Sequence, residues 1–442
     1  MRLGSSFRDP AGYLFRQDGQ LLRRVSPEYA PILDTLHSTG LYDELTSRSL
    51  LIRHREVERG HTLAPEIVRT ISYPYEWCFS QLKDAALATL EIHRVSIGHG
   101  LSLKDASAYN IQFHHGKPTL IDTLSFEPYE EGKPWRAYRQ FCEHFLAPLA
   151  LMSYVDARLS KLLQIHIDGI PLNLAAKLLP RRTVFVPGLS MHVHLHAKAQ
   201  RGTPGPAASR GSFGKAAMLG LIESLRGTIA KLTWTPRGTI WGDYYQETNY
   251  SESAMGQKHA LVEQFLQTAS PLTVWDLGAN TGEFSRLASS RGIHTVAWDF
   301  DEAAVEKNYL QSRGQPDLLP LNVDLTNPSP ALGWASEERD SFVQRCDADL
   351  VMALALIHHL AIGNNVPLER LAAFFAELSP WTIIEFVPKG DSQVRRLLAS
   401  REDIYSDYHQ TGFEAAFEET HRIVEKQPIQ GSERVLYLLQ RN

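Results

Sequence analysis

From about residue 256 onward, short apolar runs alternate with longer stretches in which apolar residues recur at helical spacing. The runs are Leu272–Trp275, Thr295–Trp298, Leu318–Val323, Asp349–Ala353, Thr382–Phe386 and Val435–Leu439. Strands separated by helices predict βαβ units, and therefore a mostly parallel α/β sheet with helices on both faces. Such a sheet binds its ligands at the carboxyl ends of the strands. We therefore expect an α/β domain over residues 256–442.

The first part of the chain, residues 1–175, has a different pattern of predicted strands and helices. Gly12–Val25 predicts a hairpin around Asp18-Gly19, because this dipeptide favours a tight turn. Three stretches have the apolar spacing of helices: Pro27–Thr39, Ala85–His99 and Trp135–Ser153. This mixture predicts an α+β N-terminal domain.

Residues 176–255 are interpreted as a connector between the two domains. Gly202–Gly214 is rich in Gly, Pro and Ser and predicts a mobile loop. Glu223 is the only acid among a series of basic residues: Arg181, Arg182, Lys198, Arg201, Arg210, Lys215, Arg226, Lys231 and Arg237. A solvated connector is the favoured interpretation, and a basic patch that binds RNA is the alternative.

Three histidines alternate within this region, at His192, His194 and His196. In a strand they would share one side, which is an arrangement that zinc can use. No cysteine or carboxylate lies nearby to complete a metal site. A polar strand face is therefore the favoured interpretation.

Composition narrows the class of protein. A chain of 442 residues is expected to hold at least two domains, and 43% hydrophobic with 21% charged residues is typical of globular proteins. No apolar run approaches the roughly 20 residues of a membrane span, and the N-terminus lacks a signal-peptide core, so no membrane contact is expected. Cys78, Cys142 and Cys346 form no metal-binding or disulfide pattern, which fits a reducing cytoplasm. A net charge of −5 argues against a dedicated nucleic-acid binder.

The most informative segment is Val274–Phe284, in which an apolar run ends at Asp276 and is followed by Gly278 and Gly282. This order predicts a strand, a tight glycine turn and a helix. The turn lets the backbone approach a ligand, and the helix N-terminus points free N–H groups at it. An acid in place of a phosphate cradle suits a cationic or amino-acid-bearing ligand.

Two further acids follow the next two predicted strands. Asp299 ends the second strand, about twenty residues on, where nucleotide-binding sheets hold ribose hydroxyls; Asp301 competes for this role. Asp324 follows the third strand. Together the acids indicate a nucleoside-type ligand at one edge of the sheet.

This constellation resembles class I S-adenosylmethionine (SAM)-dependent methyltransferases, with Asp276-x-Gly-x-x-x-Gly as motif I and 256–442 as the Rossmann-like domain that the resemblance implies. The resemblance implies SAM as cofactor. It assigns the methionine part to Asp276, Gly278, Asn280 and Gly282, the ribose to Asp299 and the adenine to Asp324. The implied reaction is methyl transfer by in-line attack of an acceptor on the sulfonium carbon, which requires positioning above all.

Candidate catalytic groups follow from the same resemblance. His358 and His359 follow the fourth strand and are candidate bases for an O or N nucleophile, although a capping or packing role is the alternative. Glu385 reaches the same rim from the fifth strand. Trp241–Tyr250, which contains Tyr245, resembles a lid over SAM, with an interdomain packing strip as the alternative. No Asn/Asp-Pro-Pro-Tyr motif follows the fourth strand, which disfavours DNA bases.

The N-terminal region carries a second resemblance. Asp105, Asn110 after four intervening residues, and Asp122 at the end of an apolar run resemble the catalytic loop and metal-binding Asp of protein-kinase-like phosphotransferases. The resemblance implies that Asn110 and Asp122 hold magnesium. The chain departs from that pattern, because it has no Gly-rich loop and no clear Lys–Glu pair. Turn chemistry is the alternative for Asp105 and Asn110.

Taken whole, the chain resembles bacterial methyltransferases of a nodulation-protein-like family, on the segments Ser6–Phe15 and Asp324–Trp334. Three hypotheses follow. The first is a SAM-dependent methyltransferase acting on a small molecule, glycan or protein that the N-terminal domain recognises. The second is a bifunctional enzyme that also binds ATP and magnesium. The third is a non-catalytic SAM-binding interaction module.

Overall fold

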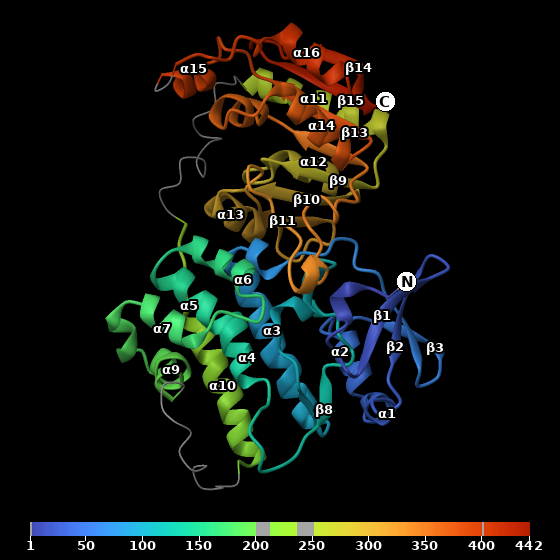
Figure 1. The fold of residues 1–442 in the computed structure, drawn as a ribbon, viewed down its shortest axis with the longest axis vertical. Helices are drawn as coiled ribbons and strands as arrows, with labels where there is room; N and C mark the ends of the chain where they lie inside the picture. The colour runs from blue at the N-terminus through green and yellow to red at the C-terminus, as the bar shows by residue number, and fades with distance from the viewer. Residues whose placement is uncertain (1, 200–212, 237–251, 400–401) are drawn as a thin grey trace. The chain divides into compact units, whose positions relative to one another are not determined.

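The computed structural model describes residues 2–199, 213–236, 252–399 and 402–442 (Figure 1). The chain divides into two compact units. Unit 1 comprises Met1–Thr235 together with Ala331–Asp340, and unit 2 comprises Pro236–Pro330 together with Ser341–Asn442. The chain therefore leaves unit 2 for ten residues and then returns to it. Within the described ranges, no helix has the length and apolar character needed to cross a bilayer.

Unit 2 is built on one sheet, to which seven strands belong in the part of the chain that the structure describes. The strands are β9 (Thr273–Leu277), β10 (His294–Asp299), β11 (Leu318–Asn322), β12 (Leu350–Ala353), β13 (Trp381–Phe386), β14 (His421–Pro428) and β15 (Val435–Arg441). Their order is β11-β10-β9-β12-β13-β15-β14. The pairs among β9 to β13 are parallel, and β15 runs antiparallel to both neighbours. The strand order reverses between β9 and β12, which creates a crevice at their carboxyl ends.

The helices of unit 2 are α11 (Glu252–Ala269), α12 (Glu283–Ser289), α13 (Glu302–Ser312), α14 (Leu368–Leu378), α15 (Ser392–Leu398) and α16 (Gln410–Glu418). Phe265 of α11 and Phe284 of α12 belong to one buried cluster with Val274 of β9. The next residue, Trp275, points to the opposite face, where its ring centroid lies 5.1 Å from that of Trp298. The sheet is therefore buried on both faces.

The expected mostly parallel sheet is confirmed, and each of the six predicted strands is present with ends shifted by at most two residues. The sequence pattern missed β14. Among the described strands it pairs with β15 alone. Most of its side chains are exposed or half-buried, so it lacks the apolar run that identified the others.

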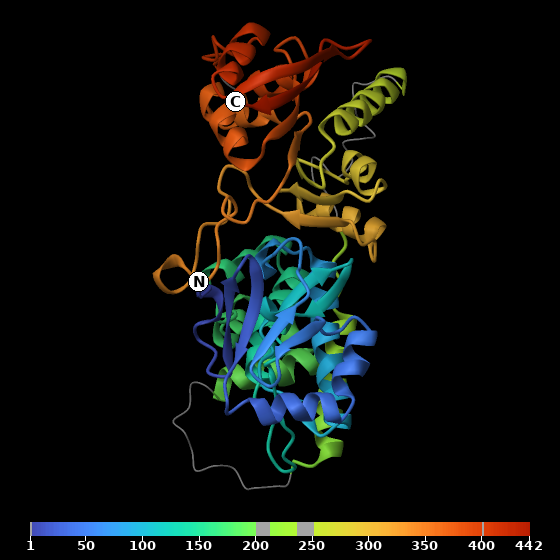
Figure 2. The same cartoon turned by 90° about the vertical axis from the view of Figure 1, so that its right-hand side faces the viewer.

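Unit 1 contains a four-stranded antiparallel sheet of order β1-β2-β4-β3, drawn in blue in Figure 2. Its strands are β1 (Gly12–Gln17), β2 (Gln20–Val25), β3 (His54–Glu58) and β4 (Thr62–Pro65). The hairpin predicted around Asp18-Gly19 is confirmed, with φ angles of 50° and 77° at these residues. Two strand pairs follow: β5 (Leu101–Leu103) with β8 (Phe126–Pro128), and β6 (Ile111–His114) with β7 (Lys117–Leu120).

The helices of unit 1 are α1 (Ala30–Ser38), α2 (Leu41–Ser47), α3 (Phe79–Gly98), α4 (Tyr138–Phe141), α5 (Ala147–Tyr154), α6 (Leu162–Ile165), α7 (Leu172–Leu178), α8 (Pro187–Leu189), α9 (His196–Ala199) and α10 (Lys215–Lys231). The helix expected from Ala85 begins earlier, at Phe79. The one expected over Trp135–Ser153 contains a π-helical segment, Cys142–Leu146, between α4 and α5.

Residues 176–235, expected to begin the connector, belong to unit 1. Helix α10 buries Met218, Ile222 and Leu225, and Lys83 of α3 donates to the carbonyls of Ala230 and Leu232. The strand expected for the alternating histidines is wrong, because Ser190–Leu195 is π-helical. Buried His192 contacts the hydroxyls of Tyr138 and Ser224, and these two contacts leave neither ring nitrogen available to a metal. The loop expected at Gly202–Gly214 lies mostly outside the described residues.

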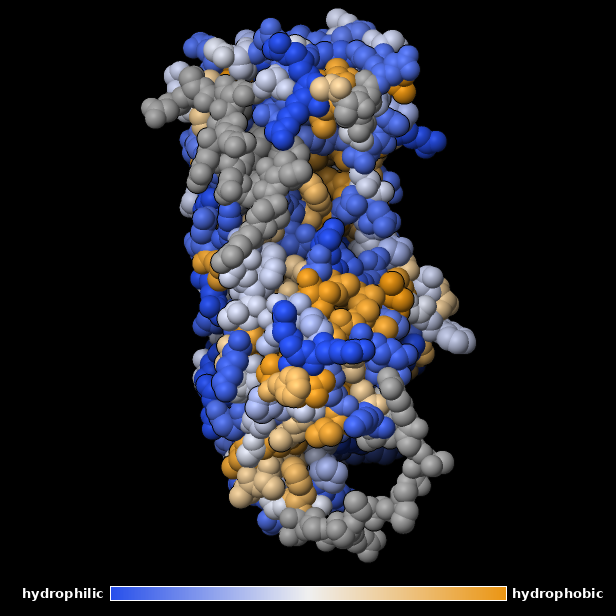
Figure 3. Space-filling model, turned by 90° about the vertical axis from the view of Figure 1, so that its left-hand side faces the viewer, coloured by the Kyte–Doolittle hydropathy of each residue, from blue (hydrophilic) through white to orange (hydrophobic). Residues whose placement is uncertain are grey.

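Apolar side chains also gather on the surface of the helical part of unit 1 (Figure 3). The described residues of this part with large exposed apolar side chains include Ile165, Leu178, Val184, Phe185, Met191 and Leu195. Phe185 is 86% exposed. Several large apolar side chains of this part of unit 1 are therefore not in its core.

Candidate active site

A cavity of about 390 Å³ lies in unit 2 at the carboxyl ends of the parallel strands. The predicted ligand-binding residues on its wall are Asp276, Gly278, Asn280, Asp299 and Asp324. They come from β9, β10 and the segment after β11, which are neighbours in the sheet. Leu354, Ala355 and Leu356, which follow β12, form another part of the wall. The cavity thus occupies the crevice at which the strand order reverses.

The turn after β9 depends on its two glycines. Gly278 and Gly282 both have φ of +78°, in the left-handed region that glycine adopts at least cost. A Cβ on Gly278 would lie 3.1 Å from Cδ1 of Leu356, and one on Gly282 would lie 2.4 Å from the side-chain amide of buried Asn308. Gly282 is not on the cavity wall and immediately precedes α12 as its N-cap residue. Its role in the structure is to let the helix approach α13.

Asp299 ties this turn to β10. One carboxylate oxygen accepts the backbone N–H of Asn280 at 2.7 Å, and the other accepts that of Asp301 at 2.9 Å. Asp301, its competitor for the ribose role, instead caps α13 by accepting the N–H groups of Ala303 and Ala304. Of these two acids, only Asp299 lines the cavity.

The buried acids of the cavity have unusual protonation equilibria. Burial raises the pKa of Asp276 to about 7, and the negative charge of Asp299 adds to this effect, although the Ser285 hydroxyl donates to Asp276 at 2.6 Å. Burial likewise raises the pKa of Asp299 to about 6. Asp324 is exposed and accepts hydrogen bonds from the backbone and hydroxyl of Thr326. A cationic ligand would favour the ionised form of the buried acids.

The two candidate histidines occupy different environments. His359 lines the cavity, and burial lowers its pKa to about 4, so its imidazole is neutral at pH 7. His358 is fully buried and is not among the lining residues; burial lowers its pKa well below the usual range. Only His359 therefore has access to a ligand in the cavity.

Glu385, the third catalytic candidate, is fully buried and is not among the lining residues. Its carboxylate accepts Nζ of Lys258 at 2.7 Å and Nη1 of Arg434 at 3.3 Å. Lys258, from α11, does line the cavity, and its Nζ lies 4.6 Å from the ring centroid of Phe284. The sequence reasoning missed Lys258, because it lies 18 residues before Asp276 on a helix without a recognisable motif. Glu385 is placed to position this lysine.

The predicted lid, Trp241–Tyr250 with Tyr245, lies outside the described residues.

In unit 1, the residues of the kinase-like resemblance lie close together. Asp105 accepts Nε2 of Gln140 at 2.8 Å, and its pKa is raised by burial and by the negative charge of Asp122. Asp122 forms an ion pair with Arg23 of β2 and accepts the Ser125 hydroxyl, to which Asn110 donates. Burial alone would raise the pKa of Asp122, but the charge of Arg23 and the Ser125 hydroxyl outweigh it and lower the pKa.

The sheet order of unit 2, the glycine turn after Asp276 and the acids at three adjacent strand ends define the class I methyltransferase fold. The chain itself belongs to the family of the nodulation protein NoeA. It is 36% identical to NoeA of Rhizobium meliloti (strain 1021) over 461 residues, which cover 100% of this chain and 96% of that protein. No protein-family model matches the chain.

Solved structures show weaker likeness. The N-methyltransferase NodS of Bradyrhizobium japonicum WM9 is 11% identical, with a TM-score of 0.32, over 43% of this chain and 98% of that one. The magnesium protoporphyrin IX methyltransferase ChlM of Synechocystis PCC 6803, with bound SAH, is 16% identical, with a TM-score of 0.31, over 43% and 84%. WbdD is 20% identical, with a TM-score of 0.30, over 42% of this chain and 40% of that one. The fold is therefore defined by the strand order and the turn rather than by these matches.

Proposed function

We propose that unit 2 binds SAM and transfers its methyl group to an O or N nucleophile of a small molecule, glycan or protein. One observation carries the proposal: Asp276, Asp299 and Asp324, from three adjacent parallel strands, line a single cavity. Strand-end acids at such a crevice are the groups that recognise a nucleoside. SAM would supply an electrophilic methyl group. The residues of the chain would bind SAM, position the acceptor and, where needed, accept its proton.

The residues on the wall match the parts of SAM in chemistry. The ionised carboxylate of Asp276 suits the ammonium of the methionine part, and Asp299 suits the ribose hydroxyls. Asp324 is an acceptor for the adenine amino group. Phe300, which lines the cavity and is 59% exposed, offers an aromatic face to the adenine. Lys258 is suited to the methionine carboxylate, with Glu385 holding its ammonium in place.

His359 is the residue best placed to act as base, because it is neutral and lines the cavity. Its low pKa makes it a weak base in the free protein, so binding of the acceptor must raise that pKa or the acceptor must carry an acidic proton. Alternatively, the enzyme could transfer the methyl group by positioning the two reactants, without a base. His359→Gln separates the two, because loss of a base lowers kcat by about 100-fold or more and leaves SAM affinity unchanged.

The proposal is tested by measuring SAM binding to the full chain by calorimetry. Asp276→Ala removes a charge-assisted contact and should weaken binding by about 10- to 100-fold. The matched control is Glu419→Ala, which removes an exposed acid of the same unit away from the cavity. Radiolabelled SAM added to an extract, with the wild-type chain and Asp276→Ala compared, then identifies the acceptor class. No measurable SAM affinity contradicts the proposal, and affinity without transfer favours a non-catalytic SAM-binding module.

A second candidate function is phosphoryl transfer in unit 1, which the proximity of Asp105, Asn110 and Asp122 favours. Carboxylate and amide oxygens are groups of the kind that magnesium prefers. If this function holds, the chain binds ATP in a magnesium-dependent way, and both Asp122→Ala and the milder Asn110→Ala abolish that binding. Equal ATP affinity with and without magnesium contradicts it.

A further inference from the structure

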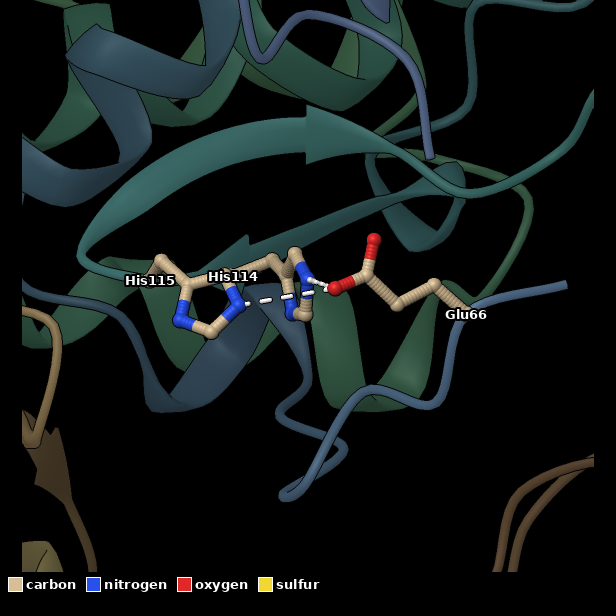
Figure 4. Close-up of side chains that lie close together, drawn as sticks. All are labelled: Glu66, His114 and His115. Carbon is tan, nitrogen blue, oxygen red and sulfur yellow. Dashed lines mark ion pairs between the residues drawn. The ribbon is translucent and has the colours of Figure 1, made fainter. Parts of the chain in front are cut away.

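Two histidines and a glutamate of unit 1 face one another at the tip of the β6–β7 hairpin (Figure 4). Glu66 follows β4, His114 ends β6, and His115 is the first residue of the turn. Oε1 of Glu66 lies 3.2 Å from Nε2 of His114 and 3.6 Å from Nε2 of His115. One potential ligand atom from each residue lies within 4.8 Å of the other two. The three side chains therefore converge on one point.

The backbone of the hairpin explains how neighbouring residues converge. His114 pairs with Lys117, and the two turn residues between them, His115 and Gly116, have φ angles of 49° and 72°. In a regular strand consecutive side chains point to opposite faces, but this left-handed turn brings both imidazoles together, with ring centroids 4.1 Å apart. A positive φ on a residue other than glycine costs about 1 kcal/mol, so histidine is not the residue that the turn alone would favour.

The distances from Glu66 to the two histidines are compatible with a tetrahedral metal centre. Zinc binds histidine nitrogen and carboxylate oxygen at about 2.0–2.2 Å, which separates adjacent ligand atoms by about 3.3–3.6 Å in a tetrahedron. The two Glu66–histidine distances, 3.2 Å and 3.6 Å, are close to this range. Two imidazoles and one carboxylate suit zinc, whereas calcium and magnesium need more oxygen ligands.

The three side chains differ in their exposure to solvent. The His114 side chain is 13% exposed, whereas those of His115 and Glu66 are 59% and 42% exposed. The site is thus anchored on one side and open to solvent on the other. The positive charge of Arg69 nearby acts against a cation, and the carboxylate of Glu66 counters it.

We propose that Glu66, His114 and His115 bind a zinc ion or a similar transition-metal dication, with the fourth coordination position open to solvent or to an exogenous ligand. The ion would join the tip of the β6–β7 hairpin to the segment after β4, and thereby to the four-stranded sheet of unit 1. This proposal does not depend on methyl transfer, because every ligand belongs to unit 1.

The test is zinc titration of the untagged, metal-stripped full chain by calorimetry, with cobalt absorption as a report on tetrahedral geometry. We expect one equivalent to bind, with affinity at least about tenfold weaker in His114→Ala and His115→Ala. Glu66→Gln should also weaken binding, since the neutral amide is a poor ligand. The matched control is His37→Ala, because His37 also contacts another histidine of unit 1. Its Nε2 lies 3.3 Å from Nε2 of His54.

Thermal unfolding provides a second readout. Zinc should raise the melting temperature of the wild-type chain and of His37→Ala, but not that of His114→Ala, because a ligand stabilises only the state that binds it. Melting without metal shows whether each variant is folded. Zinc binding that is unchanged in both His114→Ala and His115→Ala, or lost equally in His37→Ala, would overturn the proposal.

Discussion

Asp276 in unit 2 and Asp122 in unit 1 lie in contrasting electrostatic environments. Asp276 and Asp122 both follow apolar runs, and both are largely buried. Around Asp276, burial outweighs the Ser285 hydrogen bond and the charge of Lys258, and the pKa is raised. Around Asp122, the charge of Arg23 and the Ser125 hydroxyl outweigh burial, and the pKa is lowered. The same sequence signal therefore marks two physical situations. The protein itself supplies the countercharge of Asp122, whereas a ligand is suited to supply that of Asp276.

The strongest test of this difference is removal of the internal countercharge. Arg23→Met should lower the free energy of unfolding by about 3–5 kcal/mol, because it leaves the carboxylate of Asp122 buried without its partner. Urea denaturation measures the effect. The matched control, Arg24→Met, breaks an exposed pair with Glu58 and should cost at most about 1 kcal/mol. Equal effects of the two substitutions would show that Asp122 gains its countercharge elsewhere, and would end the contrast between the units.

The glycine turn gives an intermediate effect in unit 2. Gly282→Ala combines a positive φ with a Cβ 2.4 Å from the Asn308 amide, and should cost about 1–3 kcal/mol in unfolding free energy. Gly292→Ala is the matched control, because its φ is +74° but nothing lies within 4 Å of the added atom. The difference between the two variants isolates the steric contribution. If the two cost the same, close helix approach is not why glycine is required at position 282.

The smallest effect is a pH dependence confined to the cavity. With a pKa of about 7, Asp276 ionises as the pH rises from 6 to 8, and SAM affinity should rise about tenfold over that range. Calorimetry at several pH values measures this, and Asp276→Asn should flatten the profile.

In the free protein, the pH dependence of the stability contributed by Asp276 has the opposite sign. Because folding raises this pKa from 3.8, the contribution of Asp276 to the stability of the protein should fall as the pH increases from about 4 to about 7.

The sheet of unit 2 was predictable because fully buried parallel strands are short, apolar and bounded by turns. The wall residues Asp276, Gly278 and Asn280 were predictable because they follow one another along the chain. Lys258 was not, because only the packing of α11 against the sheet brings it to the cavity. Glu385 illustrates the converse error, since a strand-end acid was expected at the rim and it lies instead within a buried ion network.

The histidines of unit 1 show the same limit. His192, His194 and His196 were interpreted with strand periodicity, whereas His192 and His194 lie in a π-helical segment and contact hydroxyl groups, and His196 begins α9. The convergence of Glu66 with His114 and His115 passed unnoticed. Its cause is a left-handed turn at a histidine, and the third member lies 48 residues earlier in the chain. The spacing of residues along the chain predicts which of them share a face of a helix or strand, but it does not predict contacts made by turn residues.

The excursion of Ala331–Asp340 into unit 1 has a consequence for the synthesis of the protein. Within that unit, Arg8 contacts Glu338 at 2.6 Å, and the guanidinium of Arg339 lies 4.5 Å from the ring centroid of Tyr109. A chain emerging from the ribosome has made all of residues 1–235 long before residue 338 exists. The N-terminal unit must therefore wait, incomplete, for the translation of about a hundred further residues, and a shortened chain ending at residue 235 would never acquire these last contacts.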